Sequence, residues 1–259
     1  MTRQRIHPTA IISPDAEIAA DVEIGAFAIV GEGCVIGAGS VIAPRATLER
    51  NVTLGRSVKV GMGSILGGAP QDLKYAGEET SVEIDEGTII REYVTVNRGT
   101  SHSFKTTVGK NCLLMTYVHI GHDCRVGNSV ILSNVVQLAG HVAIEDKAII
   151  SGLSAVHQFA RVGRHSFIGG MSRVSKDIPP FLKAVGSPVK LYGLNTIGLR
   201  RSGMDEATIL ELKRAYRLLF RSDLNITQAI ERAQSELDPL PEVQELLRFV
   251  EASERGVVI

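Results

Sequence analysis

Histidines gather in the middle of the chain, at His119, His122, His141 and His157, and Asp123 directly follows the second of them. An imidazole with a pKa of about 6.5 accepts a proton readily at neutral pH. His122 could therefore act as a general base, with Asp123 setting its tautomer and a backbone N–H stabilising an oxyanion. Alternatively, imidazoles three residues apart, such as His119 and His122, could join a third histidine in binding zinc.

These histidines lie within a repeat of six residues. An aliphatic side chain recurs at every sixth position from Ile6 to Val174, and only Asp72, Glu78 and His102 break the series. A small or β-branched residue follows four positions after the aliphatic one, and neither a helix nor an ordinary strand has this period. We expect a β-solenoid in which three hexapeptide sides form a coil of about 18 residues, with coils stacked about 4.8 Å apart.

The repeat predicts which chemical groups meet. Steps of one coil stack three pairs of residues on one edge of the solenoid: His122 with Asp123, Gly140 with His141, and His157 with Gln158. All six lie outside the inward-facing columns, so we expect them to face outward. A single outward histidine is more often a solvated surface residue. A column of imidazoles, a carboxylate and an amide is hard to explain by packing, and it favours a site.

Two segments interrupt the repeat without changing its phase, residues 67–83 and 97–107. Each is expected to be a loop that leaves an intact solenoid, and loops on rigid scaffolds often carry function. The unusual composition of residues 70–78 favours a functional role for the first loop. The second loop is equally well read as functional or as a tolerated insertion. Cysteine chemistry is not expected, because all three cysteines occupy the small inward column: Cys34, Cys112 and Cys124.

The repeat ends near the two prolines before residue 181, and helical patterns follow. After a linker, residues 204–221 predict an amphipathic helix, Asn225 opens a capping box, and Pro241 suits the first turn of a third helix. The expected fold is mainly β, a parallel β-helix over residues 1–190 followed by an α-helical domain over residues 191–259.

Composition excludes several classes of function. The net charge is zero, which gives no support to nucleic-acid binding, and no apolar run is long enough to span a membrane. The N-terminal residues lack the apolar segment of a secretory signal, and we expect a cytoplasmic protein. Basic residues nevertheless outnumber acidic ones strongly over residues 157–221. This local excess predicts an acidic partner or a phosphate-bearing ligand near the end of the solenoid.

Five sequence motifs together resemble those of the UDP-N-acetylglucosamine O-acyltransferases, hexapeptide-repeat enzymes of lipid A biosynthesis. They are the segments 70–78 (PQDLKYAGE), 119–124 (HIGHDC), 138–141 (LAGH), 155–159 (AVHQF) and 193–201 (GLNTIGLRR). The resemblance covers essentially the whole chain, and it departs from the family at Gly121 and in the short second loop. The related N-acyltransferases carry a domain before their solenoid. Since the repeat here begins at residue 6, we expect the O-acyltransferase activity.

The resemblance implies a left-handed β-helix, a homotrimer with active sites between solenoids, and no metal, cofactor or covalent acyl-enzyme. The reaction would move a 3-hydroxyacyl chain from acyl carrier protein to the 3-hydroxyl of UDP-N-acetylglucosamine. The strongly acidic carrier protein would then be the partner of the basic segment. Neither the acyl chain length nor a preference for a 3-amino analogue of the sugar follows from the sequence. A structural solenoid is the least favoured alternative, because the outward positions are varied and charged.

The resemblance also assigns roles to individual residues. His122 would be the general base, Asp123 would orient it, and the Gly140 N–H would bind the thioester oxyanion. Gly170 would leave a deep acyl pocket, which leads to the hypothesis of a preference for longer chains. The remaining expected substrate-binding residues are His119, His141, His157 and Gln158, then Asp72 and Lys74 from a neighbouring subunit, and Asn195, Arg200 and Arg201 at the nucleotide.

Overall fold

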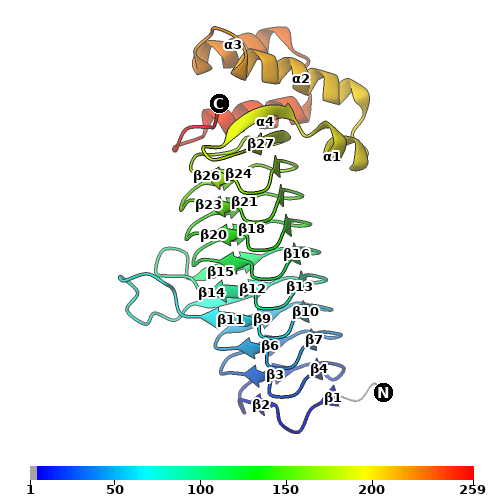
Figure 1. The fold of residues 1–259 in the computed structure, drawn as a ribbon, viewed down its shortest axis with the longest axis vertical. Helices are drawn as coiled ribbons and strands as arrows, with labels where there is room; N and C mark the ends of the chain where they lie inside the picture. Colours follow the sequence, from blue (N-terminus) through cyan, green and yellow to red (C-terminus); the bar gives the residue numbers. More distant parts are fainter. Residues whose placement is uncertain (1–4) are drawn as a thin grey trace.

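The computed structural model describes residues 5–259, so the N-terminal residues on which the absence of a signal was judged lie partly outside it. The described chain winds into a long three-sided column, with helices stacked on its C-terminal end (Figure 1). Within the described residues, no helix is both long enough and apolar enough to cross a membrane.

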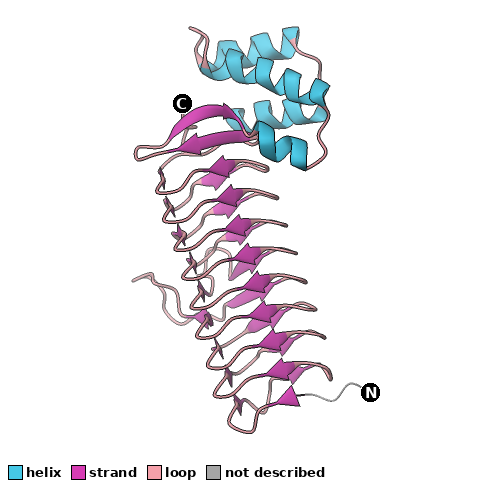
Figure 2. Ribbon diagram, turned by 45° about the vertical axis from the view of Figure 1, so that its right-hand side comes forward, coloured by secondary structure: helices cyan, strands magenta, loops and turns pink. Residues whose placement is uncertain are grey.

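Short parallel strands form the three sides of the column, and each side is one sheet (Figure 2). Sheet A contains β1 (Arg5–Ile6), β4 (Glu23–Ile24), β7 (Val41–Ile42), β10 (Lys59–Val60), β13 (Ile89–Ile90), β16 (Leu113–Leu114), β19 (Ile131–Leu132), β22 (Ile149–Ile150), β25 (Phe167–Ile168), β27 (Leu182–Val185) and the antiparallel β28 (Lys190–Leu194). Sheet B contains β2 (Ile11–Ile12), β5 (Ile29–Val30), β8 (Thr47–Leu48), β11 (Ile65–Gly68), β14 (Thr95–Asn97), β17 (His119–Ile120), β20 (Gln137–Leu138), β23 (Ala155–Val156) and β26 (Arg173–Val174). Sheet C contains β3 (Glu17–Ile18), β6 (Val35–Ile36), β9 (Val52–Leu54), β12 (Ser81–Ile84), β15 (Lys105–Val108), β18 (Arg125–Val126), β21 (Ala143–Ile144) and β24 (Arg161–Val162).

The hexapeptide pattern explains this architecture. From Ile24 onward the aliphatic residue of each repeat is buried, and in most strands it is the second residue, as at Ile120, Leu138 and Val156. The small residue lies at the turn between two sheets, where the interior is narrowest, and Cys124 and Val142 there are fully buried. Each coil thus stacks aliphatic on aliphatic, which forms one continuous apolar core along the column.

Three corners join the sheets, and we name each by the sheets it connects. The B–C corner contains the turn after β17, the C–A corner the turn after β18, and the A–B corner the turn after β16. From Phe27 onward each coil has a corner residue at positive φ, for example 60° at Asp123 and 63° at His141. Side chains other than glycine adopt this conformation at a cost of about 1 kcal/mol each, which the inter-coil hydrogen bonds offset.

Both interruptions of the repeat are loops that leave an intact column. The first lies between β11 and β12 and projects sideways, and the second lies between β14 and β15 (Figure 1). Arg98 is buried beneath the first loop, where its guanidinium donates hydrogen bonds to the Gly67 carbonyl and the Tyr75 hydroxyl.

The C-terminal part contains α1 (Thr196–Arg201), α2 (Glu206–Phe220), α3 (Ile226–Glu236) and α4 (Pro241–Glu251). The expected capping box between Asn225 and Gln228 is present at the start of α3, and Pro241 begins α4. The segment expected to be a linker instead forms the β27–β28 hairpin and α1. This segment is ordered because β27 pairs with β25 and continues sheet A, and β28 pairs with β27. The hairpin therefore crosses the expected domain boundary at residue 190.

Candidate active site

The B–C corner brings the central histidines into register. Parallel pairing aligns His119 with Gln137 and then with Ala155, so the turns after β17, β20 and β23 lie directly above one another. The His141 N–H donates to the His122 carbonyl at 2.9 Å, one coil below. The stacking predicted from the 18-residue step is therefore confirmed.

His122 and Asp123 form a close pair. The His122 Nδ1 lies 2.7 Å from Asp123 Oδ2, and the side chains are 13% and 0% exposed. A carboxylate can only accept this hydrogen bond, so the imidazole carries its proton on Nδ1 and leaves a lone pair on Nε2. This is the tautomer that a general base acting through Nε2 requires.

Gly140 lies against the His122 ring. A Cβ at residue 140 would lie 2.5 Å from His122 Nε2 and 2.5 Å from Cε1, far closer than any real contact. The absence of a side chain therefore creates the space for the imidazole. The Gly140 N–H has no hydrogen-bond acceptor among residues 5–259, and it is available to a ligand.

Asp123 was expected to face outward, and this was wrong. Its carboxylate is fully buried because the loop 97–107 folds over it, and Thr100 and Ser103 each donate to it from both backbone and hydroxyl. Burial alone would raise the pKa of Asp123. The hydrogen bonds from Ser103, His122 and Thr100 outweigh burial, and the net shift of this pKa is downward.

His141 completes the cluster from the coil above. Its ring stacks on Phe159 with centroids 4.3 Å apart, and it meets His122 edge to face at 4.9 Å. Its Nδ1 is buried without a hydrogen bond and lies 3.8 Å from Asp123 Oδ2. Desolvation lowers the pKa of His141, so this imidazole is neutral at neutral pH. His102, which the sequence marked only as a break in the repeat, packs against His141 at 4.7 Å.

The zinc alternative fits these contacts poorly. Ligand atoms of His122, Asp123 and His141 lie within 4.8 Å of one another, as a metal site would need. However, the Asp123 oxygens already accept five hydrogen bonds, and a carboxylate has about four lone-pair positions. His119 Nδ1 is occupied by the Thr95 hydroxyl at 2.8 Å. The Asp123 carboxylate and His119 Nδ1 are therefore already engaged in hydrogen bonds, which leaves them poor zinc ligands.

A hollow of about 390 Å³ opens beside His122 on the sheet B side of the corner. His119 and Gln158 contribute to its wall, as expected, and desolvation lowers the pKa of His119. Gln71 and Asn97 also line it, and sequence reasoning missed both. Gln71 belongs to the motif 70–78 in the first interruption, and Asn97 is the first residue of the second, but neither was given a role. The first loop of the same protomer therefore reaches this hollow.

Other expected substrate-binding residues near this corner differ in their surroundings. The Asp72 carboxylate accepts a hydrogen bond from the Lys74 N–H, and its charge acts on His141 of the same chain. The Lys74 side chain is exposed. His157 is also exposed, and its Nδ1 lies 3.2 Å from a guanidinium nitrogen of Arg255 in the C-terminal segment.

The expected nucleotide residues lie elsewhere in the protomer. Asn195 caps α1 through its side-chain oxygen and donates to the His165 carbonyl, and Arg200 pairs with Glu206. Arg201 lines a hollow over sheet A, next to Ile149, Phe167 and Tyr192. Gly170 lies at the A–B corner, one coil above Gly152. None of these residues contributes to the hollow beside His122.

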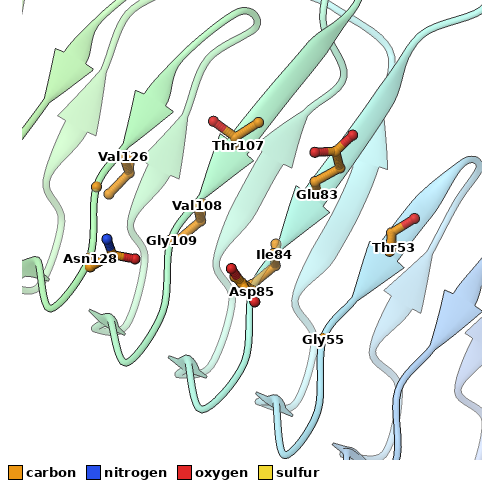
Figure 3. A pocket seen from close by; sticks show the side chains of 11 residues that line it. Thr53, Gly55, Glu83, Ile84, Asp85, Thr107, Val108, Gly109, Val126 and Asn128 are labelled. Atoms are coloured by element: carbon orange, nitrogen blue, oxygen red, sulfur yellow. The ribbon is translucent and has the colours of Figure 1, made fainter.

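A further hollow lies on sheet C (Figure 3). It is lined by Glu83, Asp85, Thr107 and Asn128, among others. Glu83 pairs with Lys105, and the Asp85 carboxylate accepts from the Glu86 N–H. The two acidic side chains are therefore already partnered, and no histidine or cysteine lines this hollow.

Sequence comparison identifies relatives over most of the chain. A profile described as UDP-N-acetylglucosamine O-acyltransferase, domain 2, matches residues 177–258. The acyl-[acyl-carrier-protein]–UDP-N-acetylglucosamine O-acyltransferase of Gloeothece citriformis is 47% identical over 191 residues, which is 74% of this chain and 69% of the relative. The enzyme of that name from Anaeromyxobacter dehalogenans is 46% identical over 192 residues, covering 74% and 75%.

This chain belongs to the UDP-N-acetylglucosamine O-acyltransferase family. The solved structure of the Bacteroides fragilis UDP-N-acetylglucosamine acyltransferase superposes with a TM-score of 0.96 at 39% identity, covering 98% of this chain and 99% of that one. The Francisella novicida enzyme gives 0.92 at 35% identity, covering 98% and 93%. The chain is thus an acyltransferase, and the expected left-handed parallel β-helix with a C-terminal helical part is confirmed.

Proposed function

We propose that this acyltransferase moves a 3-hydroxyacyl chain from acyl carrier protein to the 3-hydroxyl of UDP-N-acetylglucosamine, the first step of lipid A biosynthesis. The relatives named above support these substrates. The observation that carries the proposal is the free Nε2 of His122, held by a buried carboxylate beside an unpaired Gly140 N–H. A cytoplasmic location remains a prediction.

The geometry supports a direct transfer. His122 Nε2 accepts the proton of the sugar hydroxyl as its oxygen attacks the thioester carbonyl carbon. The Gly140 N–H stabilises the resulting oxyanion. When the tetrahedral intermediate collapses, the carbon–sulfur bond breaks and the carrier-protein sulfur takes the proton back from His122. The ester and the free thiol are the products.

A covalent acyl-enzyme is not part of the proposal, because the described residues offer no reactive thiol at this corner. Cys124 is the nearest thiol in sequence, but it is fully buried in the inward column, and burial raises its pKa to about 12. A thiol rather than a thiolate is a poor nucleophile. His122 therefore acts on the acceptor hydroxyl itself.

The complete site would lie between protomers. In a three-sided column, sheet A is the side opposite the B–C corner, so Arg201 and His122 of one chain face away from each other. They can serve one substrate only if sheet A of one protomer faces sheet B of the next. Three such contacts close a ring with the A–B corners at its axis.

Exposed apolar surface supports this arrangement. The outward positions of sheet A are apolar in four successive coils, and exposed apolar or aromatic side chains follow the A–B corner. Such a surface on an isolated chain marks an interface. The sheet A residues are Leu113, Ile131, Ile149 and Phe167, and the corner residues are Tyr93, Tyr117, Val135, Leu153 and Met171.

The general-base role is tested by His122→Ala and His122→Asn. Both variants should lose at least about a thousandfold in kcat, because neither can accept the hydroxyl proton. Their melting temperatures and trimer mass should remain those of the wild type. The matched control is His7→Ala, which removes an exposed imidazole near the other end of the column. Near wild-type transfer in the His122 variants would refute the role.

The same assay should be run with UDP-N-acetylglucosamine and with its 3-amino analogue, each with carrier proteins of several acyl lengths. Since an amine and a hydroxyl both lose a proton to His122, the comparison decides which acceptor is used. Absence of transfer from the wild type to either acceptor would refute the proposed function.

A further inference from the structure

The loop 97–107 supplies most of the hydrogen bonds that hold the Asp123 carboxylate. Asp123 Oδ1 accepts from the Thr100 N–H at 3.0 Å, the Ser103 N–H at 3.1 Å and the Ser103 hydroxyl at 2.5 Å. Oδ2 accepts from the Thr100 hydroxyl at 2.8 Å and from His122 Nδ1 at 2.7 Å. Four of the five donors therefore belong to two residues of one loop.

These contacts fix the orientation of the carboxylate and also keep it ionised. The donors approach both oxygens, so the carboxylate cannot rotate without breaking several bonds at once. Below it, the Asp123 N–H donates to the Thr106 hydroxyl, which fixes the backbone at the same point. An ionised carboxylate without solvent exposure would otherwise be strongly disfavoured.

We infer that Thr100 and Ser103 are positioning residues of the transfer reaction, because they hold Asp123 so that His122 keeps its proton on Nδ1 and presents Nε2 to the acceptor. This inference rests on the proposed function of His122. Neither residue lines the hollow beside His122, although Ser103 lines the separate hollow that His102 and His141 also line. Both residues donate hydrogen bonds to Asp123, which is how they reach His122.

The hydroxyls also have an electrostatic effect. Hydrogen bonds to the carboxylate disperse its negative charge, so Asp123 stabilises a protonated His122 less than a bare carboxylate would. Other titratable groups face this cluster from the surrounding elements: His102, His119, His141, Asp72, Arg125, Glu145, Arg161 and Glu254.

The test uses Thr100→Val, Ser103→Ala and the double variant in the full-length enzyme. Each single variant should lose about tenfold in kcat with an unchanged KM, and the double variant about a hundredfold, as expected for hydrogen bonds to a charged group. The acidic limb of the kcat/KM profile should move to higher pH in the double variant, because a carboxylate that accepts fewer hydrogen bonds attracts an imidazolium more strongly.

Two sets of controls separate positioning from folding. Thr100→Ser and Ser103→Thr keep the hydroxyls and should keep most of the activity. Thr88→Val removes a buried hydroxyl that bonds Gly109 and Cys112, far from this corner. It should lower the melting temperature without changing the pH profile. A loss of kcat in Thr88→Val equal to that in Thr100→Val would overturn the inference.

Histidine-selective ¹⁵N NMR gives a readout that does not depend on activity. The wild type should show the His122 ring with its proton on Nδ1, and the double variant should show a mixture of tautomers. An unchanged tautomer together with an unchanged pH profile would overturn the inference. If the wild type lacks transfer activity while the tautomer still shifts, the proposed function fails and the positioning contact stands.

Discussion

At the scale of single residues, the arrangement of His122 at the B–C corner depends on one position that has no side chain. Gly140 was singled out for its N–H, but the structure gives it a second role, because the His122 imidazole occupies the space of its missing Cβ. The ring is fixed between this glycine and Asp123, which also binds its Nδ1. The proposed base and the proposed oxyanion donor therefore belong to one packed unit.

Gly140→Ala should therefore disable the enzyme without unfolding it. A Cβ 2.5 Å from the ring forces His122 to rotate away from Asp123, and a shift of this size costs about a hundredfold or more in kcat. Steady-state kinetics and a melting curve provide the measurement. Wild-type kcat in this variant would show that the ring position is unimportant.

At the scale of elements, the last coils join the column to the helices through the C–A corner. Arg164 forms an ion pair with Glu245 of α4 at 2.7 Å, and Arg161 lies over the Phe249 ring at 4.3 Å. His165 is buried beside them and stacks on Phe181. Two residues of the basic segment, Arg161 and Arg164, therefore hold α4 against the column.

His165 makes the stability of this junction dependent on pH. Desolvation, with Arg164 and Lys147 nearby, lowers its pKa to about 4, below the value of about 6.5 in an unfolded chain. The unfolded state then binds the extra proton first, so stability is complete above pH 6.5 and falls as the pH drops toward 4. From pH 7 to pH 5 this residue should cost roughly 2 kcal/mol.

The measurement is denaturant unfolding of the wild type and of His165→Asn at both pH values. Asparagine tolerates the positive φ of this position, 55°, and does not titrate. The variant should lose about 2 kcal/mol less than the wild type on acidification. Equal losses would mean that His165 is not responsible.

At the scale of the whole molecule, the three-sided column determines where a site can form. One protomer presents His122 at one corner and Arg201 on the opposite side. The proposed ring of protomers would bring these two surfaces together, and it would also cover the apolar positions of sheet A.

Mixing two inactive variants tests this arrangement. His122→Ala and Arg201→Ala should each be nearly inactive, the first in kcat and the second in affinity for the nucleotide sugar. In trimers reassembled at random from equal amounts, about a quarter of the sites should combine an intact His122 with a neighbour's intact Arg201. Activity should return to that level. No recovery in mixed trimers, verified by mass, would place both residues in one chain.

The sequence alone determined the repetitive part of this protein. Aliphatic residues at every sixth position are all buried when the chain winds into coils of three hexapeptides. The coil length and the stacking of His122, Gly140 and Gln158 follow directly from this arrangement. The caps of α3 and α4 were also predictable, because Asn225, Gln228 and Pro241 act within a single helical turn.

Only the tertiary structure decided how the aperiodic segments close. The loop 97–107 covers Asp123 through hydrogen bonds between residues about twenty positions apart, and no local pattern encodes such contacts. For the same reason, residues 182–201 form a hairpin and a helix where a linker was expected, and Asn195 caps that helix. A periodic pattern specifies burial coil by coil, whereas a loop takes its shape from the partners it meets in space.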